Sequence, residues 1–147
     1  RHLRFDISLL ARRTIGAADW LNQQRFIHGL RLGFFGASTG AAAALIAASE
    51  RPEITGAVVS RGGRPDLATG ALPRVNVPVL LLVGQLDYTV IDMNEAALAQ
   101  MPLEADKKMV IVPGATHLFE EHGALEYVSR LATDWFIQHL PVNGKAD

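Results

Sequence analysis

The sequence predicts an α/β domain, a three-layer sandwich in which a mostly parallel sheet lies between two layers of helices. Short apolar runs of strand length alternate along the chain with longer segments of helical spacing. The connections between the runs are long enough for right-handed parallel crossovers. No repeat, low-complexity tract or long linker interrupts the pattern, so we expect a single domain over residues 1–147.

Four segments have the composition and spacing of helices. The first carries apolar residues at helical spacing and is preceded by Asp6, a good N-cap, while the alanine-rich second ends before Pro52. A shorter third segment is closed by Pro102, and the last has an apolar inner face. We expect these helices at about residues 7–24, 39–49, 94–101 and 123–140.

Four short apolar runs predict the strands. They are almost continuously apolar, as expected for parallel strands that are covered on both faces. Pro78 and Gly84 bound the clearest run, and Pro113 with Gly114 closes the last one. We expect these strands at residues 32–35, 56–60, 79–83 and 108–112.

The Gly-Ala-Ser-Thr-Gly turn at residues 36–40 follows a predicted strand and opens a predicted helix. This is the context of a nucleophile elbow, where crowding at a sharp turn requires small residues two positions either side of the serine. The helix N-terminus favours negative charge that develops there. A Gly-x-Ser-x-Gly match can arise by chance, but its context favours Ser38 as a nucleophile, with the Thr39 N–H as an oxyanion donor.

A catalytic serine needs a base, and geometry separates the five histidines. Active sites on parallel sheets lie at the carboxyl ends of the strands, and only His117 follows a strand closely. The alternatives are terminal, lie in a connection before a strand, or fall near the ends of the last helix: His2, His28, His122 and His139. The sequence therefore favours His117 as the base.

Asp87 is the favoured acid, because it lies just past the end of the third strand and beside the end of the next. Asp92 is the rival, although a position at the start of the following helix explains it as an N-cap. Other acidic residues fit solvated surfaces better, namely Asp66, Glu120 and Glu121. A structural role is the usual alternative for each of these side chains.

The order Ser38, Asp87, His117 resembles that of the α/β-hydrolases over nearly the whole chain. Gly84-x-x-Asp87 and the segment 113–117 resemble the dienelactone-hydrolase-like branch, and the segment 60–67 is similar to hydrolase segments fused to bacterial phosphoribosyltransferases. Dienelactone hydrolases proper use a cysteine nucleophile, whereas this chain has none. The resemblance therefore implies a serine hydrolase acting on a small carboxylic ester, lactone or thioester.

The resemblance also implies a sheet of about eight strands, of which this sequence would supply the C-terminal portion. We therefore expect upstream residues to belong to the protein. The alternative is a minimal hydrolase that forms a homo-oligomer by pairing the edge strand at 32–35 with a second copy. No loop of the kind that supplies a second oxyanion donor precedes the first helix, and loss of one donor costs about 2.7–4 kcal/mol.

Arg61 and Arg64 follow a strand end on the predicted active-site side, where they could bind a substrate carboxylate or phosphate. The alternative is that they are solvated or pair with Asp66. The chemistry implied needs no metal or organic cofactor. A net charge of −1 gives no reason to expect nucleic acid or a membrane surface as partner, and no apolar stretch is long enough to span a bilayer.

The absence of cysteine leaves the compartment open, and a cytoplasmic protein is expected. Two other functions stay open at this point. One is a non-catalytic binding or assembly module that keeps the scaffold. The other is acyl transfer or peptide hydrolysis on the same triad.

Overall fold

A four-stranded parallel sheet forms the centre of the molecule, which is described from a computed structural model over residues 2–27 and 29–140. All three strand pairings are parallel. The strands follow one another across the sheet in chain order, as β1 (Leu32–Ala37), β2 (Thr55–Arg61), β3 (Val79–Gly84) and β4 (Lys107–Val112). The predicted α/β class is therefore confirmed, with a sheet that is wholly parallel in the described residues.

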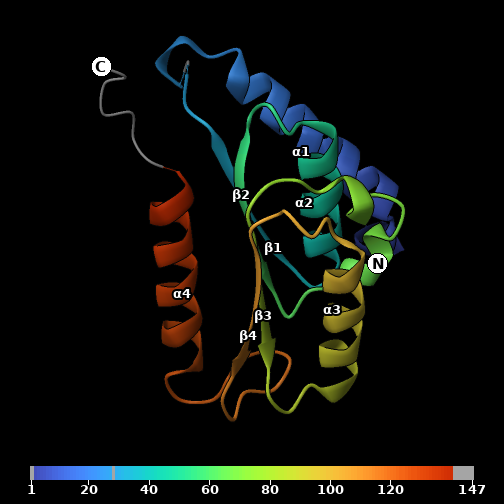
Figure 1. Ribbon diagram of the computed structural model, residues 1–147, viewed down its shortest axis with the longest axis vertical. Coiled ribbons are helices and arrows are strands. Elements are labelled where there is room, and N and C mark those ends of the chain that lie inside the picture. The colour runs from blue at the N-terminus through green and yellow to red at the C-terminus, as the bar shows by residue number, and fades with distance from the viewer. Residues whose placement is uncertain (1, 28, 141–147) are drawn as a thin grey trace.

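Helices cover both faces of the sheet (Figure 1). One face carries α1 (Ile7–Asn22), α2 (Thr39–Glu50) and α3 (Tyr88–Gln100), and the other carries α4 (Ala124–His139). The connections contain short 3-10 turns, namely η1 (His2–Phe5), η2 (Arg25–Ile27), η3 (Pro65–Ala68) and η4 (Leu72–Arg74). The three-layer arrangement follows from the need to bury both faces of a parallel sheet.

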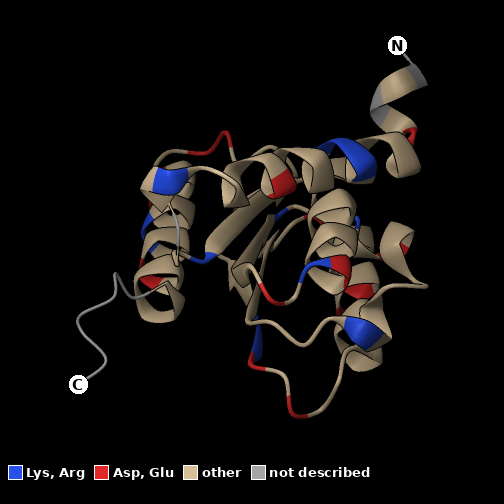
Figure 2. Ribbon diagram, turned by 90° about the horizontal axis from the view of Figure 1, so that it is seen from above, with Lys and Arg blue, Asp and Glu red and all other residues tan. Residues whose placement is uncertain are grey.

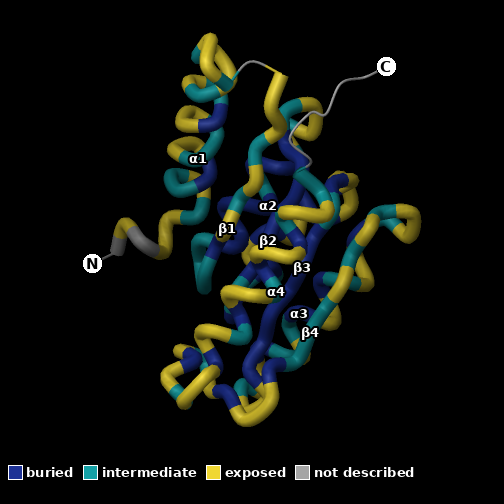
Figure 3. Tube along the Cα trace, turned by 90° about the vertical axis from the view of Figure 1, so that its left-hand side faces the viewer, coloured by how far each residue is buried: buried dark blue, intermediate teal, exposed yellow. Residues whose placement is uncertain are grey.

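The core is divided by the sheet into two apolar clusters. Val58 and Leu81 point to the side of α2 and α3, whereas their neighbours Val59 and Leu82 point to the side of α4. This alternation is the period-2 geometry of a strand. Figure 3 shows the inner strands β2 and β3 buried along most of their length, while exposed segments lie on the outer surfaces.

Alanines allow α2 to sit deep in the molecule. Seven of its twelve residues are buried, and six of those seven are alanine. Ala11 and Ala18 of α1 are also buried, so small side chains line both helices where they meet. A bidentate ion pair of 2.7 and 2.9 Å between Arg51 and Asp19 ties the end of α2 to α1.

The third predicted helix is wrong at its start. The helix α3 begins at Tyr88 rather than at about residue 94, and Asp92 is an exposed residue inside it rather than its N-cap. Its first turn contains Thr89, Val90 and Ile91, whose branched side chains disfavour helix locally. Packing of Val90 into the molecule overrides that preference. By contrast, Asp6 caps α1 as predicted, and its side chain accepts a hydrogen bond from the N–H of Leu9 at 2.9 Å.

The remaining surface is mixed in charge. Acidic and basic residues are interspersed over the helices and connections rather than gathered on one element (Figure 2). In the described part of the chain, every helix is too short or too polar to cross a bilayer.

Candidate active site

The predicted site residues lie on the connections that leave the carboxyl ends of the four strands. Ser38 follows β1, Arg61 ends β2, Asp87 follows β3 and His117 follows β4. Because the strands are parallel and adjacent, these four ends share one edge of the sheet. The fold therefore brings residues from positions 38 to 117 to one edge.

Ser38 occupies a strained turn between β1 and α2. Its backbone has φ 49° and ψ −122°, in a region that costs a non-glycine residue about 1–3 kcal/mol. A Cβ added to Gly36 would lie 2.5 Å from the carbonyl oxygen of Gly40 and 2.6 Å from the Cα of Ala41, so the predicted crowding exists on that side. On the other side it does not, because a Cβ at Gly40 would meet nothing within 4 Å.

Asp87 and His117 are joined directly. The Nδ1 of His117 lies 2.6 Å from Oδ2 of Asp87, and the Asp87 side chain is 15% exposed against 41% for His117. Asp87 stands at the N-cap position of α3, yet its side chain makes no capping bond and is directed to the imidazole. With Nδ1 donating to the carboxylate, Nε2 is the basic nitrogen that remains available.

Two connections pack closely so that this bond can form. A Cβ at Gly84 would lie 2.5 Å from the carbonyl oxygen of Ala115 and 2.6 Å from that of Thr116. The N–H of Leu86 donates to the Ala115 carbonyl at 3.0 Å, and the N–H of Gly114 donates to the Gln85 side chain at 2.8 Å. The glycine in Gly84-x-x-Asp87 therefore lets the connection after β4, which carries His117, lie against the connection after β3, which carries Asp87.

Ser38 is linked to His117 through the segment at residues 61–64. The N–H of Ser38 donates to the Arg61 carbonyl at 3.4 Å, and the N–H of Arg64 donates to the Ser38 carbonyl at 3.0 Å. Between them lies Gly62, with φ +50°, where a Cβ would be 3.2 Å from the His117 carbonyl oxygen and 3.6 Å from its Cε1. The segment thus touches both the serine backbone and the imidazole.

The two arginines of this segment have different partners. Arg64 forms a bidentate ion pair of 2.9 and 2.8 Å with Asp66, which raises the pKa of Arg64 and lowers that of Asp66. The guanidinium of Arg61 lies 5.8 Å from the centroid of the Phe119 ring, and its buried Nε has no hydrogen-bond partner. Among the described residues, no carboxylate pairs with Arg61.

The rival residues lie elsewhere or make other contacts. His139, at the far end of α4, packs on Trp135 at 4.3 Å between ring centroids and lies 3.3 Å from Asp106. His28 lies outside the described residues. Glu120 is exposed, and Glu121 accepts hydrogen bonds from the Thr116 side chain and from backbone N–H groups, which lower its pKa.

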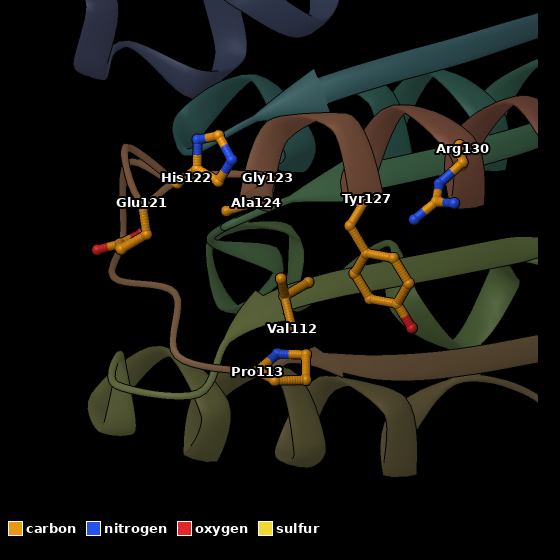
Figure 4. Close-up of a pocket in the computed structure, with 8 residues that line it drawn as sticks. All are labelled: Val112, Pro113, Glu121, His122, Gly123, Ala124, Tyr127 and Arg130. Carbon is orange, nitrogen blue, oxygen red and sulfur yellow. The ribbon is translucent and has the colours of Figure 1, made fainter.

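A pocket of about 270 Å³ lies between the two ends of the connection from β4 to α4, the connection that carries His117 (Figure 4). Both ends of that connection line it, together with the first turns of α4. The lining residues are Val112, Pro113, Glu121, His122, Gly123, Ala124, Tyr127 and Arg130. It contains none of Ser38, Asp87 and His117. In the part of the chain that is described, no cluster of three or more His, Cys, Asp or Glu side chains is arranged to hold a metal ion.

Two residues of this region were missed in the sequence. Gly62 lies between the two candidate arginines Arg61 and Arg64, and the Gly-Gly pair that follows the strand is the signal of a tight backbone approach. The sequence predicts Asn94 at the start of a helix, whereas it is fully buried inside α3 and its side chain donates to the Gly63 carbonyl at 3.0 Å. An asparagine in the interior of a helix is the one signal that could have indicated it.

The chain is similar to solved hydrolase structures. It is 58% identical to a dienelactone hydrolase from Anabaena variabilis, with a TM-score of 0.91, and the match covers 95% of this chain and 64% of that one. It shares its fold with the Est1E protein of Butyrivibrio proteoclasticus, crystallised with ferulic acid, at 16% identity and a TM-score of 0.74 over 88% of this chain and 67% of that one.

Curated relatives are found in two strains of Mycobacterium tuberculosis. These proteins carry the provisional name phosphoribosyl transferase and are 53% identical to this chain over 136 residues. The match covers 92% of this chain and spans only 30% of their length. The model of the dienelactone hydrolase family matches residues 8–139, and the chain therefore belongs to the dienelactone hydrolase family.

Proposed function

We propose that this chain is a serine hydrolase that cleaves a small carboxylic ester, lactone or thioester through an acyl-enzyme on Ser38. The hydrogen bond of 2.6 Å between His117 and Asp87 carries the proposal, because it fixes the tautomer in which Nε2 can accept a proton. Membership of the dienelactone hydrolase family supports hydrolysis as the reaction. The name of the mycobacterial relatives belongs to longer proteins, and this chain matches only 30% of their length.

In the proposed mechanism, Oγ of Ser38 attacks the carbonyl carbon and its proton passes to Nε2 of His117. Asp87 keeps the ring oriented and stabilises the imidazolium that forms. Thr39 is the first residue of α2, so its N–H has no intrahelical acceptor and can donate to the oxyanion. His117 then gives the proton to the leaving alcohol or thiol, and a water molecule activated in the same way releases the acid from Ser38.

A fluorophosphonate probe tests the nucleophile. We expect labelling of one site, mapped by mass spectrometry to the peptide that contains Ser38, and loss of labelling in Ser38→Ala. Ser49→Ala is the matched control, because the Ser49 hydroxyl donates to the Ile46 carbonyl at the other end of the same helix. Absence of labelling in the folded, unchanged chain would contradict the proposal and favour a binding or assembly module.

We also propose that Arg61, rather than Arg64, binds a carboxylate or phosphate group of the substrate. Arg64 is engaged by Asp66, whereas Arg61 has no such partner among the described residues. Arg61→Gln should raise KM for an anionic ester by about tenfold or more, because a hydrogen bond to a charged group contributes about 1.5–3 kcal/mol. KM for a neutral ester of the same size should stay unchanged, and equal effects on both esters would contradict this role.

A further inference from the structure

The segment at residues 61–64 holds the backbone on both sides of the proposed nucleophile. Its first residue accepts the N–H of Ser38 and its last residue donates to the carbonyl of Ser38, at 3.4 and 3.0 Å. The N–H of Gly62 donates to the Leu82 carbonyl at 2.7 Å, which ties the segment to the end of β3. A shift of this segment would therefore move Ser38 relative to the sheet.

The same segment supports the imidazole. Gly62 and Gly63 are both buried, and Gly62 lies against the carbonyl and the Cε1 of His117. An added Cβ at Gly63 would collide with the Ser60 side chain and with Cβ of Ala41, so the segment also packs tightly on β2 and α2. These contacts place the segment between the serine turn and the His117 backbone, so a small displacement of the segment reaches both.

One buried side chain reaches this segment from α3. Asn94 has no exposed surface, and its Nδ2 donates to the Gly63 carbonyl at 3.0 Å and to the Val90 carbonyl at 2.8 Å. It lies seven residues after Asp87, the N-cap of α3, so about two helical turns separate the two residues along the chain. The proposed catalytic acid thus stands at the start of the helix that carries the amide bonded to the segment 61–64.

We propose that Asn94 is a positioning residue, whose amide fixes the segment 61–64 and thereby holds Ser38 and the His117 ring in their relative places. The proposal rests on the serine hydrolase function stated above. A displacement of about 1 Å at reacting atoms can reduce the rate by about a hundredfold. Loss of the Asn94 amide should therefore lower kcat while leaving the binding of a small ester nearly unchanged.

The test replaces the amide by an apolar group of similar size, in Asn94→Leu. Gln100→Leu is the matched control, because Gln100 lies on the same helix and its amide donates to the carbonyl four residues earlier, at 3.1 Å, on the exposed surface. We expect kcat of Asn94→Leu to fall by between tenfold and about a hundredfold, with KM within about twofold. In the control Gln100→Leu, kcat and KM should both equal those of the unchanged chain.

A second measurement follows the segment without relying on activity. Hydrogen exchange of the Gly62 and Arg64 amides should become faster in Asn94→Leu, while exchange in the middle of β3 stays the same. If Asn94→Leu does not fold, Asn94→Ser replaces it, since its hydroxyl can still bond to the Val90 carbonyl but is too short for Gly63.

The two readouts separate the inference from the function on which it rests. If Ser38 of the unchanged chain does not react with the probe, the proposed function fails, and the exchange of the Arg64 amide still tests the role of Asn94. Unchanged exchange and unchanged kcat in a folded variant would overturn the inference. A second result would overturn it as well: fewer Asn94→Leu molecules react with the probe, but each reactive molecule turns over substrate at the unchanged rate. That result is the signature of a purely structural residue.

Discussion

Gly36 and Gly40 lie two positions either side of Ser38, but their surroundings in the fold differ. A Cβ at Gly36 would meet backbone atoms of Gly40 and Ala41 at 2.5–2.7 Å, and those atoms belong to the turn that holds the serine. A Cβ at Gly40 would point into open space from the second residue of α2. The familiar pattern of two small residues therefore has a steric cause on one side only.

This difference predicts opposite effects of the same substitution. Gly36→Ala should lower the free energy of unfolding by about 1–3 kcal/mol, as overpacking does, and should also slow the labelling of Ser38. Gly40→Ala should raise the free energy of unfolding by up to about 1 kcal/mol, because alanine is the better helix former. Urea unfolding of the two variants measures both changes, and equal midpoints would contradict the steric argument.

The positions of the proposed catalytic residues could be predicted from the order of the strands, whereas a contact to a distant backbone atom could not. Ser38, Asp87 and His117 each follow a strand, so the topology alone indicates that they share one edge of the sheet. Asn94 binds the carbonyl of Gly63, thirty-one residues earlier in the chain. No pattern around Asn94 records that contact, because any residue could supply the carbonyl.

At the scale of elements, the strands could be placed within one or two residues because each is a short apolar run bounded by polar residues, proline or glycine, and the two inner strands β2 and β3 are buried on both faces. The apolar run of β3 is buried at every position, which leaves little ambiguity about its extent. The helix α3 was placed six residues too late, since its first turn has weak helical propensity and is stabilised by tertiary packing. Propensity alone could not have located Tyr88 as its start.

The connection between β4 and α4 carries His117 and contains a carboxylate with a lowered pKa. The Thr116 side chain and the backbone N–H groups of Glu121 and Thr116 stabilise the ionised form of Glu121. A lowered pKa contributes stability that is complete above the ordinary glutamate pKa, about 4.3, and is lost as the pH falls from there through the folded-state value. Acid should therefore weaken this connection.

Glu121→Gln tests this pH dependence. The variant should unfold at a lower temperature than the unchanged chain near neutral pH, and the difference should shrink as the pH falls below about 4. Glu120→Gln is the control, because Glu120 is the exposed neighbour. A difference in Tm that persists undiminished at low pH would show that the Glu121 charge has no part in it.

At the scale of the whole molecule, the two edges of the described sheet are unlike. The edge strand β4 begins with Lys107 and Lys108, and charged residues discourage pairing with another strand. The edge strand β1 has the sequence Leu-Gly-Phe-Phe-Gly-Ala, without a charge, and Phe35 is 52% exposed. Beside it, a groove of about 430 Å³ lies between β1 and α1, with Ala17, Leu21 and Phe34 among its lining residues.

The sequence leaves two partners open for this edge, an upstream strand of the protein or a second copy of the chain, and we propose that the β1 edge pairs with a second copy wherever no upstream strand covers it. A two-fold axis would set the two β1 strands antiparallel, so that each strand offers its unpaired N–H and C=O groups to the other. Phe35→Lys should abolish this self-association, because it places two like charges at the shared edge and removes exposed apolar surface. Leu103→Lys is the matched control, since Leu103 is 92% exposed in the connection between α3 and β4. Sedimentation velocity over a dilution series should show association that Leu103→Lys retains and Phe35→Lys loses, and association that survives Phe35→Lys would assign the contact to another surface.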